Sequence, residues 1–216
     1  MKLERFKYPR TFHVPWSPGS SDDDKRHTEE TLNKMFSGKN VIVTEKLDGE
    51  NTSIYSDGTV HARSIASLHH QSRSYVKSLA GDLGPQLPSG WRLLGENMYA
   101  KHSIAYDRLP DYFIIFGIVN ELNIALSWHE VKEYSVLLGL PHVTELYNGS
   151  WDREKIISLY PFNSSFGLEA EGYVIRDDGS WPMVEFGAHV AKYVRANHVQ
   201  TNKHWKNQKI VPNKKA

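Results

Sequence analysis

The chain has 216 residues, enough for one domain of ordinary size with a substantial apolar core. Hydrophobic residues make up 39% and charged residues 24%, which is typical of soluble globular proteins and excludes a disordered chain. The absence of cysteine excludes disulfide scaffolds, thiolate metal sites and cysteine nucleophiles. The first residues lack the apolar segment of a signal peptide, and the longest apolar run, Tyr112 to Val119, is too short to cross a bilayer. We therefore expect a cytoplasmic protein without membrane contact.

The net charge of +1 hides an uneven distribution of charge along the chain. Residues 186–216 contain no Asp or Glu but carry seven Lys and Arg residues, which leaves the rest of the chain acidic. A basic end on an acidic body favours a surface that faces a polyanion. For the last ten or so residues, a solvent-exposed tail without a partner explains the charge equally well. Lys192 and Arg195 are different because they alternate with apolar residues.

The first quarter of the chain contains an arm, a helix and β-rich runs. Three prolines among aromatic residues predict an ordered but irregular arm over residues 8–24. Residues 28–36 have the pattern of a short helix that Thr28 caps and Gly38 ends. Three β-branched runs follow, separated by Asp-Gly pairs, and predict a three-stranded antiparallel meander. These runs cover residues 40–46, 52–55 and 59–63, with the pairs at Asp48-Gly49 and Asp57-Gly58.

The remaining elements mix helices with strands. The pattern predicts helices over residues 72–80 and 128–138, the second ended by Gly139, and a loop over residues 81–90. Strands are expected over residues 91–94, 111–119, 172–176 and 183–195, with a turn at 177–180 between the last two. The run at 111–119 is apolar on both faces and should be buried. The fold class is therefore α+β, with antiparallel sheets flanked by helices.

The tetrad Lys46-Leu47-Asp48-Gly49 carries the strongest chemical signal. Its ordinary explanation is a hairpin turn beside a lysine. Its functional interpretation is a lysine at the end of a rigid strand, whose amine attacks an electrophile in a cleft. A lysine with a pKa of ~10.4 is protonated at neutral pH and does not attack, so a metal ion or another cation must lower the pKa of Lys46.

Other chemically useful residues follow the tetrad in a fixed order. Each has an ordinary explanation when taken alone, such as a loop dipeptide for Gly95-Glu96 or a core position for Phe116. The ordered set favours a single site. Its members are Arg63-Ser64, Gly95-Glu96-Asn97, Phe116-Gly117, the run from Glu171 to Arg176, Lys192 and Arg195.

With these residues, the chain resembles the nucleotidyltransferase domain of the covalent ligase superfamily, and most closely the ATP-dependent RNA ligases of the T4 RNA ligase 2 type. The resemblance covers residues 40–200 and implies an ATP-grasp-like fold with ATP in a central cleft. We expect residues 1–39 to form an arm and short helix packed on this domain, and residues 201–216 to form a basic tail. No separate OB domain is expected.

The resemblance also implies roles for residues that match the family motifs. Lys46 would attack the α-phosphate of ATP and carry AMP. The carboxylates Asp48, Glu96 and Glu171 would hold one or two Mg²⁺ or Mn²⁺ ions, and Glu96 is also a candidate for the ribose hydroxyls. Glu45 would accept from the adenine amino group, and Phe116 would stack on the adenine. Lys192 would contact the α-phosphate, and Arg63 would bind phosphate or ribose. The other expected nucleotide-binding residues are Leu47, Asn51 and Arg195.

One departure from the family pattern concerns the last of these residues. The family spaces two lysines as Lys-x-Lys, whereas this chain has Lys192 and Arg195. Strand alternation places these two residues on opposite faces. Lys192 is expected to help lower the pKa of Lys46 by cationic repulsion.

The function that the resemblance implies is sealing of RNA ends that carry a 5′-phosphate and a 3′-hydroxyl, by a monomer. RNA contacts should involve the backbone phosphates, with further contributions from His69, His70, Arg73, Lys101 and His102. Three alternatives stay open: a minimal DNA ligase, a capping-type guanylyltransferase, and a self-adenylylating nucleotide-binding module without sealing activity.

Overall fold

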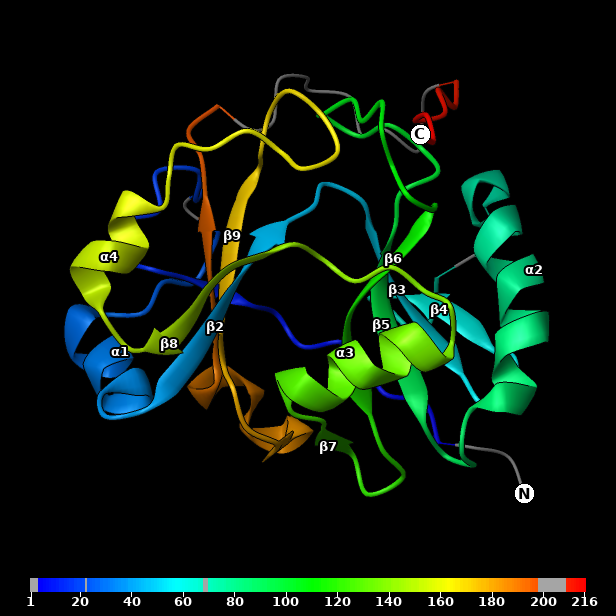
Figure 1. The fold of residues 1–216 in the computed structure, drawn as a ribbon, viewed down its shortest axis with the longest axis horizontal. Helices are drawn as coiled ribbons and strands as arrows, with labels where there is room; N and C mark the ends of the chain where they lie inside the picture. The colour runs from blue at the N-terminus through cyan, green and yellow to red at the C-terminus, as the bar shows by residue number, and fades with distance from the viewer. Residues whose placement is uncertain (1–3, 22, 68–69, 198–208) are drawn as a thin grey trace.

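Two β-sheets form the centre of the molecule (Figure 1). The structure, a computed structural model, describes residues 4–21, 23–67, 70–197 and 209–216. The five-stranded sheet has the order β1 (Phe12–His13), β11 (Val190–Val194), β9 (Gly172–Asp177), β2 (Asn40–Lys46) and β8 (Glu145–Ser150). The six-stranded sheet has the order β10 (Trp181–Pro182), β7 (Ile124–Ala125), β6 (Phe113–Val119), β5 (Arg92–Asn97), β3 (Glu50–Tyr55) and β4 (Val60–Ala62). All pairings are antiparallel except that of β1 with β11.

Helices cover the two sheets, which confirms the predicted α+β class. Helices α1 (Glu29–Phe36) and α4 (Arg153–Ser158) lie at the five-stranded sheet, whereas α2 (Ser74–Leu83) and α3 (Trp128–Leu137) lie at the six-stranded sheet (Figure 1). Three short 3₁₀ helices complete the regular structure of the described residues: η1 (Gln71–Arg73), η2 (Gly84–Gln86) and η3 (Met183–Ala188).

Strand β2 shows how alternation builds two cores. Val41 and Val43 pack with the buried face of α1, whereas Ile42 packs with the residues of the six-stranded sheet. All three side chains are fully buried. Both faces of β2 are therefore covered, and the strand end is held rigidly between the two cores.

The predicted helices are confirmed, and local signals account for their ends. The Thr28 side chain accepts a hydrogen bond from the Thr31 backbone N–H at the start of α1, as expected of a cap. Ser127 and Glu130 form a reciprocal capping box at the start of α3. Gly38 and Gly139 follow these helices with φ of 76° and 63°, a conformation that glycine adopts without a steric penalty.

The predicted three-stranded meander is wrong, because its first run belongs to a different sheet from the other two. Strand β2 pairs with β9 and β8, so both of its edges are occupied and β3 cannot pair with it. Only the hairpin of β3 and β4 forms, around Gly58 with φ of 77°. Residues 47–49 carry the chain from one sheet to the other.

The predicted strand over residues 183–195 is also wrong in its first half. Met183 and Phe186 are buried in the core of the six-stranded sheet, and their spacing suits the 3₁₀ helix η3. The strand β11 then begins at Val190 in the other sheet. The expected loop at 81–90 starts late, because α2 continues to Leu83. Strands β1, β7, β8 and β10 and helix α4 have no counterpart among the expected elements.

The N-terminal arm crosses from one sheet to the other (Figure 1). Tyr8 packs edge-on against Phe116 of β6 at a centroid distance of 5.6 Å. Further along, His13 lies in register with Lys192 of β11, and the Val14 backbone N–H donates to the Lys192 carbonyl at 2.8 Å. The arm is therefore ordered, as expected, and is anchored to both sheets.

Residues 209–216 pack against the body of the molecule, whereas residues 201–208 of the expected tail lie outside the described residues. The side chain of Asn213, 4% exposed, accepts from the Tyr106 backbone N–H at 3.0 Å and donates to the Met98 carbonyl at 2.8 Å. The Tyr106 hydroxyl in turn accepts from the Asp48 backbone N–H at 2.9 Å. This segment thus braces the crossing at residues 47–49.

In the part of the chain that the structure describes, no helix has both the length and the apolar character needed to span a bilayer.

Candidate active site

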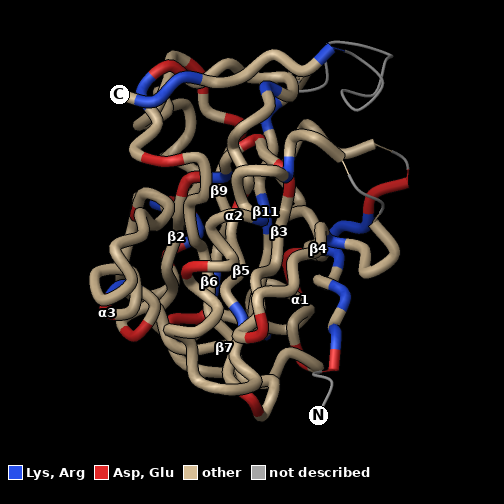
Figure 2. Tube along the Cα trace, turned by 90° about the vertical axis from the view of Figure 1, so that its right-hand side faces the viewer, with Lys and Arg blue, Asp and Glu red and all other residues tan. Residues whose placement is uncertain are grey.

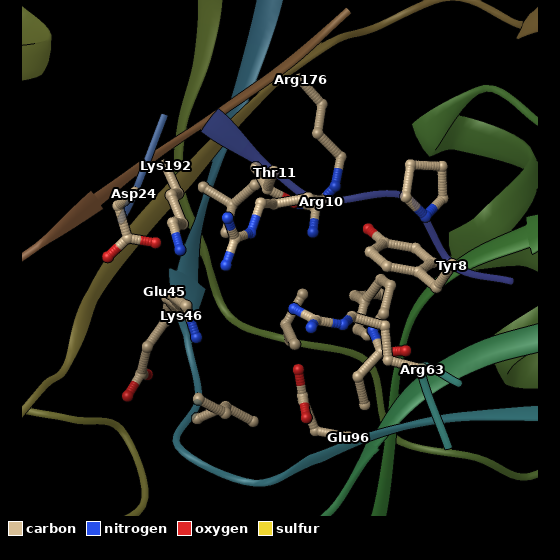
Figure 3. A pocket seen from close by; sticks show the side chains of 16 residues that line it. Tyr8, Arg10, Thr11, Asp24, Glu45, Lys46, Arg63, Glu96, Arg176 and Lys192 are labelled. Atoms are coloured by element: carbon tan, nitrogen blue, oxygen red, sulfur yellow. The ribbon is translucent and has the colours of Figure 1, made fainter. Parts of the chain in front are cut away.

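A cavity of about 180 Å³ opens between the two sheets (Figure 3). Eight of the eleven site residues chosen from the sequence line it: Glu45, Lys46, Leu47, Asn51, Arg63, Glu96, Phe116 and Lys192. The other lining residues are Tyr8, Pro9, Arg10, Thr11, Asp24, Val143, Val174 and Arg176. The structure therefore gathers into one cavity residues that are far apart in the sequence.

Lys46, the last residue of β2, is held by a carboxylate. Its Nζ lies 2.7 Å from Oε2 of Glu171, and its side chain is 23% exposed. Burial by itself lowers the pKa of Lys46, but the negative charges of Glu171 and Glu96 outweigh it and hold this pKa above its usual value. The expectation of a lowered pKa is therefore wrong for this arrangement, because the nearest charged group to the amine is a carboxylate and not a cation.

Lys192, and not Lys46, is the lysine whose pKa is lowered. Burial, and next the positive charge of Lys46, lower the pKa of Lys192 to about 8. Its register partner on β9 is Val174, which also lines the cavity. The expected repulsion between the two lysines exists, but its main effect is on Lys192.

The three carboxylates proposed for metal binding have different surroundings. Burial raises the pKa of Glu96 to about 8, and its Oε2 has no hydrogen-bond partner among the described residues. Glu171 holds Lys46. Oδ2 of Asp48 accepts from the backbone N–H groups of Ser103 at 2.7 Å and Ile104 at 2.9 Å.

These surroundings decide which carboxylates suit a cation. Across the described residues, no group of three or more His, Asp or Glu side chains is arranged to hold a metal ion. Glu96, a partly buried carboxylate that lines the cavity and whose Oε2 is buried, fits a hard divalent cation best, with Glu171 as its neighbour. Asp48 acts here as an anchor for the loop at Ser103.

Phe116, proposed to stack on adenine, contacts two other groups. The Arg176 guanidinium lies over its ring at 5.5 Å from the centroid, and the Tyr8 ring meets it edge-on. Nη1 of Arg176 donates to Oγ1 of Thr44 at 2.6 Å. A base that stacks on Phe116 would therefore have to share this ring with Arg176 or displace it.

Two further predicted residues are placed differently from the others. Oε2 of Glu45 accepts from the Ser165 backbone N–H at 3.2 Å, and burial raises the pKa of this carboxylate. Arg195 does not line the cavity. Its Nη2 lies 2.6 Å from Oε2 of Glu169, on the opposite side of β11 from Lys192 as alternation requires.

Neither the arm nor Arg176 was assigned a role in the site from the sequence, although Arg176 ends one run of the ordered set. The sequence offered a signal for Arg176, because it lies on β9 two residues after Val174 and in alternation with it. No local signal placed Tyr8, Arg10, Thr11 and Asp24 at the cavity, because contacts between distant segments bring the arm there. These contacts are the pairing of β1 with β11 and the packing of Tyr8 against Phe116.

Comparisons with known proteins show the family to which the chain belongs. The family model described as RNA ligase matches residues 39–194, so the chain belongs to the RNA ligase family. No curated protein sequence matches the chain.

The chain is similar in fold to Naegleria gruberi RNA ligase solved with PPi, with a TM-score of 0.58 and 17% identity over 90% of this chain and 61% of that one. It is also similar to two point variants of that enzyme solved with ATP and Mn. One has a TM-score of 0.55 and 16% identity over 90% of this chain and 62% of that one. The other also has a TM-score of 0.55 and 16% identity, over 94% of this chain and 65% of that one. The chain thus spans about three fifths of the length of these relatives.

Proposed function

We propose that this chain is an ATP-dependent RNA ligase that joins 5′-phosphate and 3′-hydroxyl RNA ends through a covalent lysyl-AMP intermediate. The single observation that carries the proposal is the position of Lys46. Its amine lies at the end of a rigid strand, lines a cavity between two sheets, and faces carboxylates and Lys192. Membership of the RNA ligase family supports the same activity.

In the first step, Nζ of Lys46 forms a bond to the α-phosphorus of ATP, and the bond from that phosphorus to the pyrophosphate oxygen breaks. The attacking amine must first lose a proton, and Oε2 of Glu171 at 2.7 Å is the acceptor within reach. Lys192 and Arg63 line the same cavity and supply positive charge for the phosphates.

In the later steps, AMP passes from Lys46 to the 5′-phosphate of RNA, and the 3′-hydroxyl displaces AMP to form the phosphodiester. A divalent cation at Glu96 and Glu171 would neutralise the charges that raise the pKa of Lys46. Structural relatives contain ATP and Mn, which supports ATP as the substrate and a divalent metal as its companion.

The test is covalent labelling of the protein with α-labelled ATP and Mg²⁺, followed by a denaturing gel. Wild type should carry the label and Lys46→Ala should not. Lys39→Ala is the matched control, because Lys39 precedes the same strand and its Nζ is also paired with a carboxylate, Asp177, at 2.7 Å. Label on Lys46→Ala, or an unlabelled wild type, would overturn the proposal.

Two additional assays, one of nucleotide preference and one of substrate sealing, separate the alternative functions. Labelling by GTP in preference to ATP would indicate a guanylyltransferase. Nicked substrates with RNA or DNA at the 3′-hydroxyl side separate an RNA ligase from a DNA ligase. Labelling without sealing of any substrate would identify a self-adenylylating module.

A further inference from the structure

Arg10 lies at the mouth of the cavity and points into it. In Figure 3 its guanidinium group points toward the amines of Lys192 and Lys46. Arg10 is exposed, and its Nη1 donates to the Asp23 carbonyl oxygen at 3.0 Å. Within the described ranges, no carboxylate forms an ion pair with Arg10.

The position of Arg10 follows from the way the arm is anchored. Phe12 and His13 are in parallel register with Ala191 and Lys192 of β11. The ring of Pro9 restricts the backbone before Arg10. Because these contacts and the Tyr8 ring already hold the arm in place, Arg10 is not needed to dock it.

The lining of the cavity that Arg10 joins has more positive than negative charge. Its cations are Arg10, Lys46, Arg63, Arg176 and Lys192, and its acids are Asp24, Glu45 and Glu96. Like charges that face one another raise the free energy of the folded state, so such a cluster is typical of a site that an anion completes. An exposed arginine at the mouth of such a site can bind phosphate oxygens through two parallel hydrogen bonds.

Figure 2 shows that the charge continues outside the cavity. The N-terminal segment rises along one edge of the molecule, and Lys and Arg residues follow one another along it. Arg10 is the member of this series that lines the cavity. Arg10 is exposed whereas Lys192 is partly buried, so Arg10 is the more accessible of the two to an incoming anion.

We propose that Arg10 and Lys192 form a phosphate-binding subsite on the arm side of the cavity. The subsite takes the pyrophosphate part of ATP or the terminal 5′-phosphate of RNA, which share the same chemistry. This inference rests on the proposed function for the identity of the ligand, but the subsite itself is defined by the residues of the arm.

The first test measures binding of inorganic pyrophosphate by calorimetry and needs no catalysis. Arg10→Gln should weaken binding by about tenfold or more, as expected for loss of hydrogen bonds to a charged group. Lys7→Gln is the control, because Lys7 is an exposed cation of the same segment that does not line the cavity. It should change the affinity by less than about twofold. Equal affinities for Arg10→Gln and wild type would overturn the inference.

The second test identifies the source of the phosphate. If pyrophosphate is the ligand, Arg10→Gln slows labelling of Lys46 by ATP and leaves sealing of pre-adenylylated RNA unchanged. If the RNA 5′-phosphate is the ligand, labelling is normal and transfer of AMP to RNA is slowed. Normal rates in both assays would overturn the inference. If wild type is never labelled but pyrophosphate binding depends on Arg10, the proposed function fails and the subsite stands.

Discussion

A buried ion pair directly follows the crossing between the sheets, and its removal should strongly destabilise the fold. Glu50 is the first residue of β3, and Arg73 ends η1. Nε and Nη2 of Arg73 lie 2.5 Å from Oε2 and Oε1 of Glu50, and the two side chains are 4% and 7% exposed. The expectation that Arg73 contributes to RNA contacts is wrong, because its guanidinium is buried against this carboxylate.

Arg73→Met keeps most of the side-chain volume and removes the charge. The Glu50 carboxylate is then buried without the guanidinium, and breaking a buried pair in this way typically costs about 3–5 kcal/mol. This is a large fraction of the roughly 5–15 kcal/mol by which domains are stable. The double variant Arg73→Met/Glu50→Leu should recover most of the loss, because an apolar pair of similar volume stabilises a core about as well as a buried ion pair.

Urea unfolding followed by tryptophan fluorescence measures these free energies. Arg108→Met is the matched control, since Arg108 pairs with Asp107 and both side chains are 58% exposed. It should change the free energy of unfolding by less than about 1 kcal/mol. If Arg73→Met is no more destabilising than Arg108→Met, the reasoning about the buried charge is refuted.

Three further predictions concern the site and its supports. Because the pKa of Glu96 is also about 8, the first measurement uses a Glu96→Gln background, in which this carboxylate cannot titrate. Pyrophosphate affinity should then fall as the pH rises from 7 to 9, because Lys192, with a pKa of about 8, loses its positive charge over this range. Calorimetry on the same background with Lys192→Arg added should show a flatter pH profile of affinity, and identical profiles would contradict the role of Lys192. Gly172→Ala should destabilise the protein by more than about 1 kcal/mol in urea unfolding, because Gly172 has φ of 155° and a Cβ there would lie 2.1 Å from the Tyr193 carbonyl oxygen. The control is Gly187→Ala, which should be tolerated because an added Cβ there meets no atom within 4 Å. Equal effects of the two substitutions would refute the steric argument. Asn213→Ala should increase hydrogen exchange at the Tyr106 amide by about tenfold, since that N–H donates to the lost side chain; unchanged protection in NMR exchange would show that the bond does not hold the loop.

Local signals were sufficient for the helices and for many of the site residues. The Thr28 cap and Gly139 mark their helix ends within a few residues of sequence, so no distant contact is needed to find them. Phe116 was predicted on a buried strand, and its place on β6 brings it to the cavity. Such positions are predictable because strand alternation alone decides which side chains share a face.

Pairing between distant segments was not predictable from the same signals. Asp48-Gly49 has the composition of a hairpin turn, but the Asp48 carboxylate binds the backbone at Ser103 and Ile104, more than fifty residues away. The charge state of Lys46 depends in the same way on Glu171, 125 residues further along the chain. No window of local sequence contains both partners of these interactions, so composition and periodicity could not reveal them.

The crossing and the arm together explain why the cavity lies where it does. Residues 47–49 join the end of β2 to the start of β3, where Asn51 lies in register with Glu96. The chain also passes between the two sheets over residues 126–144, 178–180 and 183–189. The arm adds a further anchored link, from Phe116 at Tyr8 to Lys192 at His13. Several links of this kind restrict changes in the distance between the facing residues of the sheets. Lys46 and Lys192 on one sheet are thereby held at a set distance from Glu96 and Phe116 on the other, which is the preorganisation that phosphoryl transfer requires.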